Sequence, residues 1–262
     1  MLQPFTINDL CVVVASNDDE TLRRNLMVSP LVLSGVQFHI ERNAASAAVA
    51  YNRGLDATDA PFVIFAHHDV YFPPGWEKKL FSAIDCIGKI DPDWALIAPF
   101  GMSATGEAVG DVWSTSLGRR VGRPVQRPET VQSYDELAFI LRRDSGLRFD
   151  EDLSAWHMYG TDIVQSAREL GKNSWVADLP VVHNDRSKRG RIGSDFDDAY
   201  HFIRRKWKEQ LPIRTSILWI TPLGISLPLW RLRRWRKMVV RPDVALDPDL
   251  DPRYYSALSG WE

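Results

Sequence analysis

The stretch Phe62-Val-Ile-Phe-Ala-His-His-Asp-Val-Tyr-Phe-Pro-Pro-Gly-Trp76 decides how the rest of the chain is interpreted. Its first five residues are all apolar, which predicts a buried β-strand. The strand delivers His67, His68 and Asp69 into the turn beyond its end, and residues 71–76 close that turn and lead into a helix. Open α/β sheets place ligands at the carboxyl ends of their strands, so these three side chains are candidate metal or phosphate ligands.

Composition limits the class of protein. The chain has 262 residues, 45% of them apolar and 25% charged, which suits one large α/β domain or two small ones. A net charge of −2 gives no general signature of nucleic-acid binding. Cys11 and Cys86 are the two cysteines, and their apolar or amphipathic surroundings predict buried free thiols in a reducing compartment. The start of the chain lacks the pattern of a signal peptide and no apolar run reaches the length of a membrane span, so we expect a cytoplasmic protein.

The order of expected elements predicts an α/β fold. Strands at 11–16, 36–40, 62–66 and 94–100 alternate with helices at 17–27, 44–55 and 75–90. This order predicts a mainly parallel central sheet with helices on both faces. Beyond it we expect long loops or a small hairpin at 101–128, strands at 136–142 and 175–183, and helices ending near 170 and spanning 196–208.

The end of the chain differs in character, so we divide the chain into a domain at 1–210 and a C-terminal extension at 211–262. Residues 217–230 are apolar but interrupted by proline and glycine, and a cluster of arginine and lysine follows immediately. Residues 243–251 are acidic and proline-rich, which predicts an extended tail. The segment 217–241 either lies in a membrane interface, anchored by Trp219, Trp230 and Trp235, or packs on the domain or on a second copy. The sequence leaves these alternatives, and a homo-oligomer, open.

Three acidic or imidazole side chains are the strongest candidates for chemistry. Asp69 and His183 are both expected at strand ends, where they could share a divalent cation, Mn²⁺ or Mg²⁺, with a substrate diphosphate. Asp162, in the first turn of a helix, is a candidate general base. Structural alternatives stay open for each, because a histidine is often simply hydrogen-bonded and an aspartate often caps a turn or a helix.

Residues after the first two strands would border a nucleotide pocket in a doubly wound sheet, namely Ser16, Asn17 and Glu41. The sequence contains no GxGxxG, no GxxxxGK[ST] and no GxSxG, so it lacks the motifs of dinucleotide-binding proteins, P-loop proteins and serine hydrolases.

From Cys11 to Trp207 the order of motifs resembles the family 2 glycosyltransferases with the GT-A fold, most closely a divergent bacterial branch with a histidine-rich metal motif. The segments that carry the resemblance are Val12-Val-Val-Ala-Ser-Asn17, Ala50-Tyr-Asn-Arg-Gly-Leu55, Phe65-Ala-His-His-Asp-Val70, Phe149-Asp-Glu, His157-Met-Tyr-Gly-Thr-Asp162, Val182-His183 and Lys206-Trp207. Two positions depart from the family pattern. His67 stands where the first aspartate of Asp-x-Asp is usual, and Tyr51 stands where arginine is usual.

The resemblance implies a function and a role for each matched residue. Asp69 and His183 would hold Mn²⁺ or Mg²⁺ on the diphosphate of a UDP-, GDP- or dTDP-sugar, and Asp162 would deprotonate the acceptor hydroxyl, with inversion at the anomeric carbon. The donor pocket implied by the family consists of Ser16, Asn17, Glu41, Asn52, His67 and His68. Trp156, His157 and Tyr159 would face a saccharide or lipid-linked acceptor. Such enzymes make surface polysaccharides or glycoconjugates, and a lipid-linked acceptor would place the protein on the inner face of the cell membrane.

Two other classes stay open. A metal-dependent phosphoester hydrolase could use the cluster of His67, His68, Asp69, Asp162 and His183. A catalytically inactive GT-A domain could serve as a binding module, because His67 removes one of the expected carboxylates. Nucleotide release without an acceptor would distinguish the hydrolase, and loss of turnover in Asp162→Asn would argue against the inactive module.

Overall fold

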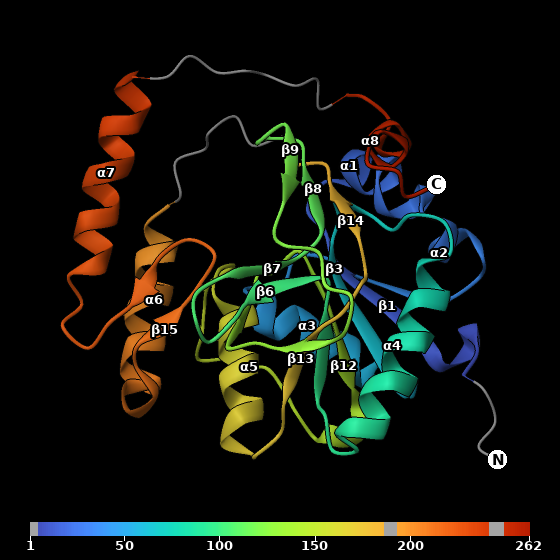
Figure 1. The fold of residues 1–262 in the computed structure, drawn as a ribbon, viewed down its shortest axis with the longest axis horizontal. Coiled ribbons are helices and arrows are strands. Elements are labelled where there is room, and N and C mark those ends of the chain that lie inside the picture. The colour runs from blue at the N-terminus through green and yellow to red at the C-terminus, as the bar shows by residue number, and fades with distance from the viewer. Residues whose placement is uncertain (1–4, 186–192, 241–248) are drawn as a thin grey trace.

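The computed structural model describes residues 5–185, 193–240 and 249–262, with side chains described throughout these ranges except at 234–240. The largest sheet in this part of the chain has seven strands and forms the centre of the molecule (Figure 1). Its order across the sheet is β10 (Glu129–Thr130), β13 (Ser174–Val176), β5 (Leu96–Ala98), β12 (Ala138–Arg142), β3 (Phe62–His67), β1 (Leu10–Ala15) and β2 (Gln37–Glu41).

The central sheet is mixed but mainly parallel. Strands β2, β1, β3, β5 and β13 run in one direction, and β12 and β10 run against them. The expected α/β fold class and the parallel core of strands are confirmed. The strand expected at 136–142 is β12, and it pairs antiparallel on both sides, between β3 and β5.

Helices cover both faces of the sheet, which explains why β3 is apolar along nearly its whole length. Val63 and Phe65 belong to the core beneath α3 (Ala47–Asp56) and α5 (Tyr159–Glu169). Ile64 and Ala66 point to the opposite face, where α4 (Trp76–Ile90) packs. Alternate side chains of one strand therefore enter two separate cores.

Three smaller sheets surround the central one. The first consists of β11 (Ser133–Tyr134), β6 (Phe100–Met102) and β7 (Ala108–Gly110). The second consists of β4 (Val70–Tyr71), β14 (Val181–His183), β8 (Val112–Ser114) and β9 (Arg119–Val121). The third consists of β15 (Ile213–Arg214) and β16 (Trp219–Ile220). The other α-helices are α1 (Asp19–Arg24), α2 (Pro30–Leu33), α6 (Ser194–Lys206), α7 (Ser226–Val240) and α8 (Pro252–Leu258), and short 3₁₀ turns occur at Ile7–Asp9, Leu26–Val28, Arg143–Ser145 and Lys208–Gln210.

Four local expectations need correction. The helix expected to reach residue 27 ends at Arg24, because the Asn25 side chain donates to the carbonyl of Thr21 and the backbone turns there. The strand expected at 175–183 is divided into β13 and β14, which join different sheets, since Pro180 between them has no N–H for a ladder. Cys86 is an exposed thiol, whereas Cys11 is buried, and both are free. In the region 101–128, where we expected long loops or one small hairpin, there are two hairpins, β6–β7 and β8–β9.

The described segments beyond 210 pack on the domain at two places. Ile213, Leu218, Ile220 and Leu227 are buried in the cluster that also contains α5 and α6. Further on, Tyr255 of α8 stacks on the Trp113 ring with centroids 5.2 Å apart. In Figure 1 α7 lies at one edge beside α6, and α8 lies at the other side near α1. The boundary at 210 stays a prediction, and most of the acidic tail, together with the side chain of Trp235, falls outside the described residues.

Among the described residues, no helix combines the length and the apolar character that crossing a bilayer requires.

Candidate functional site

The site begins where β3 ends. His67 is the last residue of β3, and His68 and Asp69 form the turn into the short strand β4. β4 pairs antiparallel with β14, with Val70 opposite His183, and the backbone N–H of Asn184 donates to the Asp69 carbonyl over 2.8 Å. This backbone pairing places the side chains of Asp69 and His183 beside each other, although they are far apart in the sequence.

His67, Asp69 and His183 form one compact group. Their ligand atoms all lie within 4.8 Å of one another. His183 Nε2 is 3.4 Å from Asp69 Oδ1, and His67 Nδ1 is 3.9 Å from the same oxygen. The two imidazole rings face this carboxylate with centroids 5.8 Å apart. The structure thus brings the two predicted metal ligands together and adds His67 to them.

Electrostatics couples the members of this group. Burial would raise the pKa of Asp69, but the charge of His183, with smaller contributions from His67 and His68, holds that pKa below its usual range. Burial would lower the pKa of His183, but attraction to the Asp69 carboxylate raises it to about 10. Burial lowers the pKa of His67 to about 4, so this imidazole stays uncharged at neutral pH.

The group fits a divalent metal ion. Asp69 Oδ1 is buried and accepts no hydrogen bond from the described residues, which is costly for a carboxylate oxygen. It lies between two imidazole nitrogens, and two imidazoles with one carboxylate are a common donor set for divalent transition metals. These three residues could therefore hold a metal ion.

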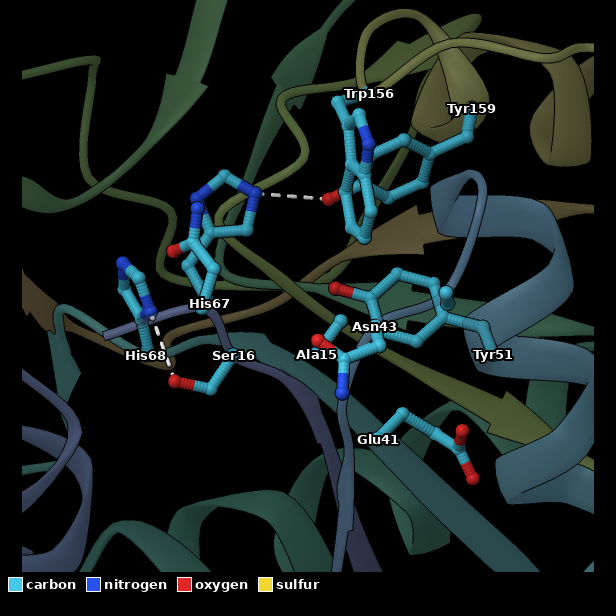
Figure 2. Close-up of a pocket in the computed structure, with 11 residues that line it drawn as sticks. Ala15, Ser16, Glu41, Asn43, Tyr51, His67, His68, Trp156 and Tyr159 are labelled. Atoms are coloured by element: carbon cyan, nitrogen blue, oxygen red, sulfur yellow. Dashed lines mark hydrogen bonds between the residues drawn. The ribbon is translucent and has the colours of Figure 1, made fainter. Parts of the chain in front are cut away.

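A cavity of about 440 Å³ adjoins this group through His67 (Figure 2). It lies at the carboxyl ends of β1, β2 and β3, where ligands of open α/β sheets are expected. Seven predicted site residues line it, namely Ser16, Asn17, Glu41, His67, His68, Trp156 and Tyr159. One side is formed by the strand ends, and the other by residues at and just before the start of α5.

Hydrogen bonds fix the histidines at the cavity. His68 Nδ1 lies 3.1 Å from Ser16 Oγ, and His67 Nε2 lies 2.8 Å from Tyr159 Oη; both bonds are drawn in Figure 2. Glu41 is held by His39, whose Nε2 is 2.6 Å from Glu41 Oε1. Trp156 is 44% exposed, so its indole offers a free aromatic face at the cavity.

Sequence reasoning missed other lining residues, among them Tyr51, Asn43 and Ala44. Tyr51 attracted notice only as a departure from a family pattern, yet its ring lies under the cavity and contacts the Tyr159 ring at 5.4 Å. Asn43 has a φ of 57°, a left-handed conformation that asparagine tolerates, and this turn shapes the cavity wall. An Asn after a strand is a weak signal, and we see no other sign that would have identified it.

Besides Asp69 and His183, three predicted site residues are not among the residues that line the cavity. Asn52 is buried, and its amide bonds both the carbonyl and the N–H of Phe149 and also Glu151, so it holds the 149–151 loop. His157 points towards α6, with Nε2 3.6 Å from an Asp195 oxygen and its ring against Phe196. Burial lowers the pKa of His157.

The third is Asp162, which is in the first turn of α5 as expected but is only 2% exposed. One carboxylate oxygen accepts from Trp207 Nε1 at 2.7 Å and the other from Lys206 Nζ at 2.9 Å. Lys206 also bridges to Asp150 at 2.6 Å. Burial raises the pKa of Asp162, and the nearby Lys206 partly opposes this. The roles of Asn52, His157 and Asp162 at a substrate stay predictions.

Comparisons with known proteins identify the fold. No model of a known protein family matches the chain. A curated protein of Fuscovulum blasticum, described as "ATP synthase subunits region ORF 6", is 27% identical over 158 residues, which are 57% of this chain and 59% of that protein. Among solved structures, GalNAc-T7 with UDP, GalNAc and Mn²⁺ has a TM-score of 0.52 at 13% identity, covering 96% of this chain and 57% of that one. The mannosyltransferase PcManGT from Pyrobaculum calidifontis, in complex with GDP-Man and Mn²⁺, has a TM-score of 0.48 at 11% identity, covering 88% of this chain and 70% of that one.

The chain has the GT-A fold of GalNAc-T7, as the sequence predicted. It spans less than two thirds of the length of both the curated relative and GalNAc-T7.

Proposed function

We propose that this protein transfers a sugar from a nucleotide-diphosphate sugar to a hydroxyl group, in a metal-dependent reaction that inverts the anomeric carbon, as a divergent member of the family 2 glycosyltransferases. One observation carries the proposal: the group of His67, Asp69 and His183 opens onto the cavity at the strand ends of a GT-A fold. GalNAc-T7, which shares the fold, was crystallised with UDP, GalNAc and Mn²⁺.

The cavity suits the donor. Ser16, Asn17 and Glu41 surround its end over β1 and β2, where polar side chains can bond the nucleoside. His68, fixed by Ser16, lines the same cavity as His67, where its imidazole can face the diphosphate. A divalent cation held by Asp69, His183 and His67 would neutralise negative charge that develops on the leaving nucleoside diphosphate.

The acceptor side is proposed at Trp156 and Tyr159. The exposed indole of Trp156 offers an apolar face on which a sugar ring can stack. Asp162 is proposed as the base that takes the proton of the acceptor hydroxyl, and its burial, which raises its pKa, would make it a stronger proton acceptor. Lys206 and Trp207 must release one of its oxygens before that oxygen can meet a hydroxyl.

A panel of UDP-, GDP- and dTDP-sugars, each with Mn²⁺, Mg²⁺ or EDTA, tests the donor by thermal shift. A ligand at about 100 times its dissociation constant stabilises the folded state by about 2.7 kcal/mol, a shift of roughly 5–10 °C for a chain of this size. The shift should need the metal and should disappear in Asp69→Asn. The matched control is Asp178→Asn, an exposed aspartate bonded to Lys79 on the surface, which should keep the full shift. No shift with any donor would refute the proposed function.

Turnover decides between transfer and hydrolysis. Sugar transfer requires an acceptor, so the nucleoside diphosphate should accumulate with a saccharide or lipid-linked acceptor and stay near background without one. Rapid release without any acceptor would instead support the phosphoester hydrolase, and donor binding without any turnover would support the inactive module.

We further propose that α7 lies on the surface of an anionic membrane, where a lipid-linked acceptor for a surface polysaccharide would be found. Leu227 and Trp230 of α7 face the core, but Leu229 and Leu232 of α7, and Ile225 just before its first residue, are exposed and spaced four and three residues apart. This spacing gives the helix a second apolar stripe, on its outer face. Beside it, a surface cavity is lined by four basic side chains, His201, Arg204, Arg205 and Lys208. Apolar side chains next to basic ones suit the boundary between lipid headgroups and acyl chains.

Flotation with vesicles tests this contact. The protein should float with phosphatidylglycerol vesicles and not with purely zwitterionic ones, and Leu229→Glu with Leu232→Glu should abolish flotation. Leu258→Glu is the control, since Leu258 is equally exposed but lies on α8. Equal flotation of all three proteins, or of none, would contradict the proposal.

A further inference from the structure

We propose that Tyr159 is a positioning residue for the metal site: its hydroxyl fixes the ring of His67 so that Nδ1 becomes a metal ligand, and the resulting site of two nitrogens and one oxygen selects Mn²⁺-like transition ions over Mg²⁺. This inference rests on the proposed metal-dependent function. It also gives a definite role to His67, which stands where the family pattern has a carboxylate.

The direction of two hydrogen bonds assigns the ring nitrogens. Tyr159 Oη lies 3.1 Å from the carbonyl oxygen of Glu136 and 2.8 Å from His67 Nε2. A carbonyl oxygen can only accept, so the single hydroxyl proton of Tyr159 points to Glu136. The tyrosine oxygen must then accept from His67, and Nε2 carries the hydrogen. In the neutral imidazole, the form that binds metals, the lone pair is therefore on Nδ1, the atom that faces Asp69.

The distances fit ligands of one ion. Two ligand atoms each about 2.1 Å from a metal lie roughly 3.0 Å apart at a right angle, 3.4 Å apart at a tetrahedral angle, and 4.2 Å apart when opposite. Asp69 Oδ1 is 3.4 Å from His183 Nε2 and 3.9 Å from His67 Nδ1. Both distances fall inside this range, and both are too long for a hydrogen bond of ordinary length. Asp69 is therefore spaced from each histidine as two ligands of one ion are.

Tyr159 is itself immobile, which positioning requires. It is the first residue of α5 and only 2% exposed, and its ring packs against the rings of Tyr51, Phe139 and Phe149. The preceding Met158 has a φ of 64°, so the chain turns tightly there and places Tyr159 next to His67. The hydroxyl therefore acts as a fixed point against which the imidazole is oriented (Figure 2).

The donor set decides the metal. Mg²⁺ prefers oxygen ligands and retains its waters, whereas imidazole nitrogens suit later divalent ions. A pair of carboxylates would serve either ion. With His67 in place of one of them, two of the three protein ligands are nitrogens, a set that suits Mg²⁺ less well than it suits transition ions.

The test measures metal binding without any sugar donor. Mn²⁺ is titrated into the full chain and free Mn²⁺ is followed by electron paramagnetic resonance, with Mg²⁺ as competitor. We expect Mg²⁺ to displace Mn²⁺ only when Mg²⁺ is in excess. Tyr159→Phe should weaken Mn²⁺ binding roughly 10- to 100-fold, as loss of a ligand's hydrogen-bond partner does. Spin-echo modulation from bound Mn²⁺ should show both histidine nitrogens in the parent protein and a weakened or lost coupling in Tyr159→Phe.

Two variants control the experiment. Tyr134→Phe removes a hydroxyl that is equally buried and also bonded to a backbone carbonyl, that of Trp175, and it should leave Mn²⁺ affinity unchanged. Circular dichroism and thermal melting confirm that each variant is folded. His67→Asp restores an oxygen ligand and should raise Mg²⁺ affinity relative to Mn²⁺.

The outcomes separate this inference from the proposed function. Equal affinity for Mg²⁺ and Mn²⁺, a single coordinated histidine nitrogen, or parent-like Mn²⁺ binding in Tyr159→Phe would each overturn the inference, even if sugar transfer is observed. Two coordinated nitrogens that depend on Tyr159, in a protein that binds no nucleotide sugar, would support the inference and reject the proposed function.

Discussion

Replacing Asp162 with asparagine tests whether this buried carboxylate stabilises the fold, performs chemistry, or does both. In the folded protein its two oxygens accept from the indole N–H of Trp207 and from the ammonium group of Lys206. Asparagine has the same shape, but its amide nitrogen is a donor. Whichever way the amide is turned, a donor faces either Trp207 or Lys206, so one of the two hydrogen bonds is lost.

The expected cost follows from those contacts. Loss of a hydrogen bond to a charged group costs about 1.5–3 kcal/mol, and a buried donor left without a partner costs about 1–3 kcal/mol. Removing the charge recovers part of this, because burial penalises the Asp162 carboxylate and raises its pKa. We expect Asp162→Asn to lower the free energy of unfolding by about 2–4 kcal/mol.

Urea denaturation of the parent and the variant measures this difference. Asp150→Asn is the matched control, because Asp150 bonds the same lysine at 2.6 Å but is more exposed. Asp150→Asn should lower the free energy of unfolding by no more than about 1 kcal/mol. If Asp162→Asn unfolds within about 0.5 kcal/mol of the parent, the hydrogen bonds do not stabilise the fold as argued. Turnover measured where both proteins are folded gives the second answer: nucleotide binding with lost turnover supports the base, and unchanged turnover removes Asp162 from the mechanism.

Three further changes have expected outcomes. Burial raises the pKa of Glu136 from its ordinary 4.5 to about 8, so the folded state holds this proton more tightly than the unfolded state does. The free energy of unfolding should therefore fall as pH rises from 4.5 through 8, by at most about 5 kcal/mol, and Glu136→Gln should remove that fall. The same change of the urea midpoint between pH 5 and pH 9 in the parent and in Glu136→Gln would contradict this expectation. Gly54→Ala places a Cβ 2.2 Å from Val13 Cγ1 and should lower the free energy of unfolding by about 1–3 kcal/mol in thermal denaturation. Gly88→Ala places its Cβ in open space and should leave the free energy of unfolding unchanged. The same melting temperature for both variants would show that the contact with Val13 relaxes freely. Trp156→Ala should raise the dissociation constant of the donor or the acceptor by roughly tenfold in calorimetric titration, with an unchanged melting temperature. If the dissociation constants of both ligands are unchanged, the indole is not part of the binding surface.

Much of the architecture was predictable because hydrophobic patterns are local. The apolar run at 62–66 predicts a strand covered on both faces, and the amphipathic pattern from Trp76 predicts both ends of α4 to within a residue or two. The site residues at strand ends followed from the same reasoning: once β1, β2 and β3 are parallel, Ser16, Glu41 and His67 must share one edge of the sheet.

What escaped prediction depends on contacts between distant segments. No local pattern shows that β12 inserts antiparallel between β3 and β5, because β12 is buried on both faces and so has the same continuous apolar run as its parallel neighbours. The interruption at Pro180 was visible, but its consequence, the pairing of β14 with β4, was not. The position of Tyr51 beneath the cavity depends on how α3 packs on the sheet, and the engagement of Asp162 by Lys206 depends on where α6 ends.

The pairing of β4 with β14 has a consequence for how such a protein can diversify in evolution. Asp69 and His183 are held beside each other by backbone pairing, and backbone hydrogen bonds do not depend on which side chains flank them. Substitutions of other side chains around the cavity can then change which ligands fit, while the distance between Asp69 and His183 stays the same. A lineage with this arrangement can therefore vary the lining of its cavity by drift and keep this pair of side chains in place.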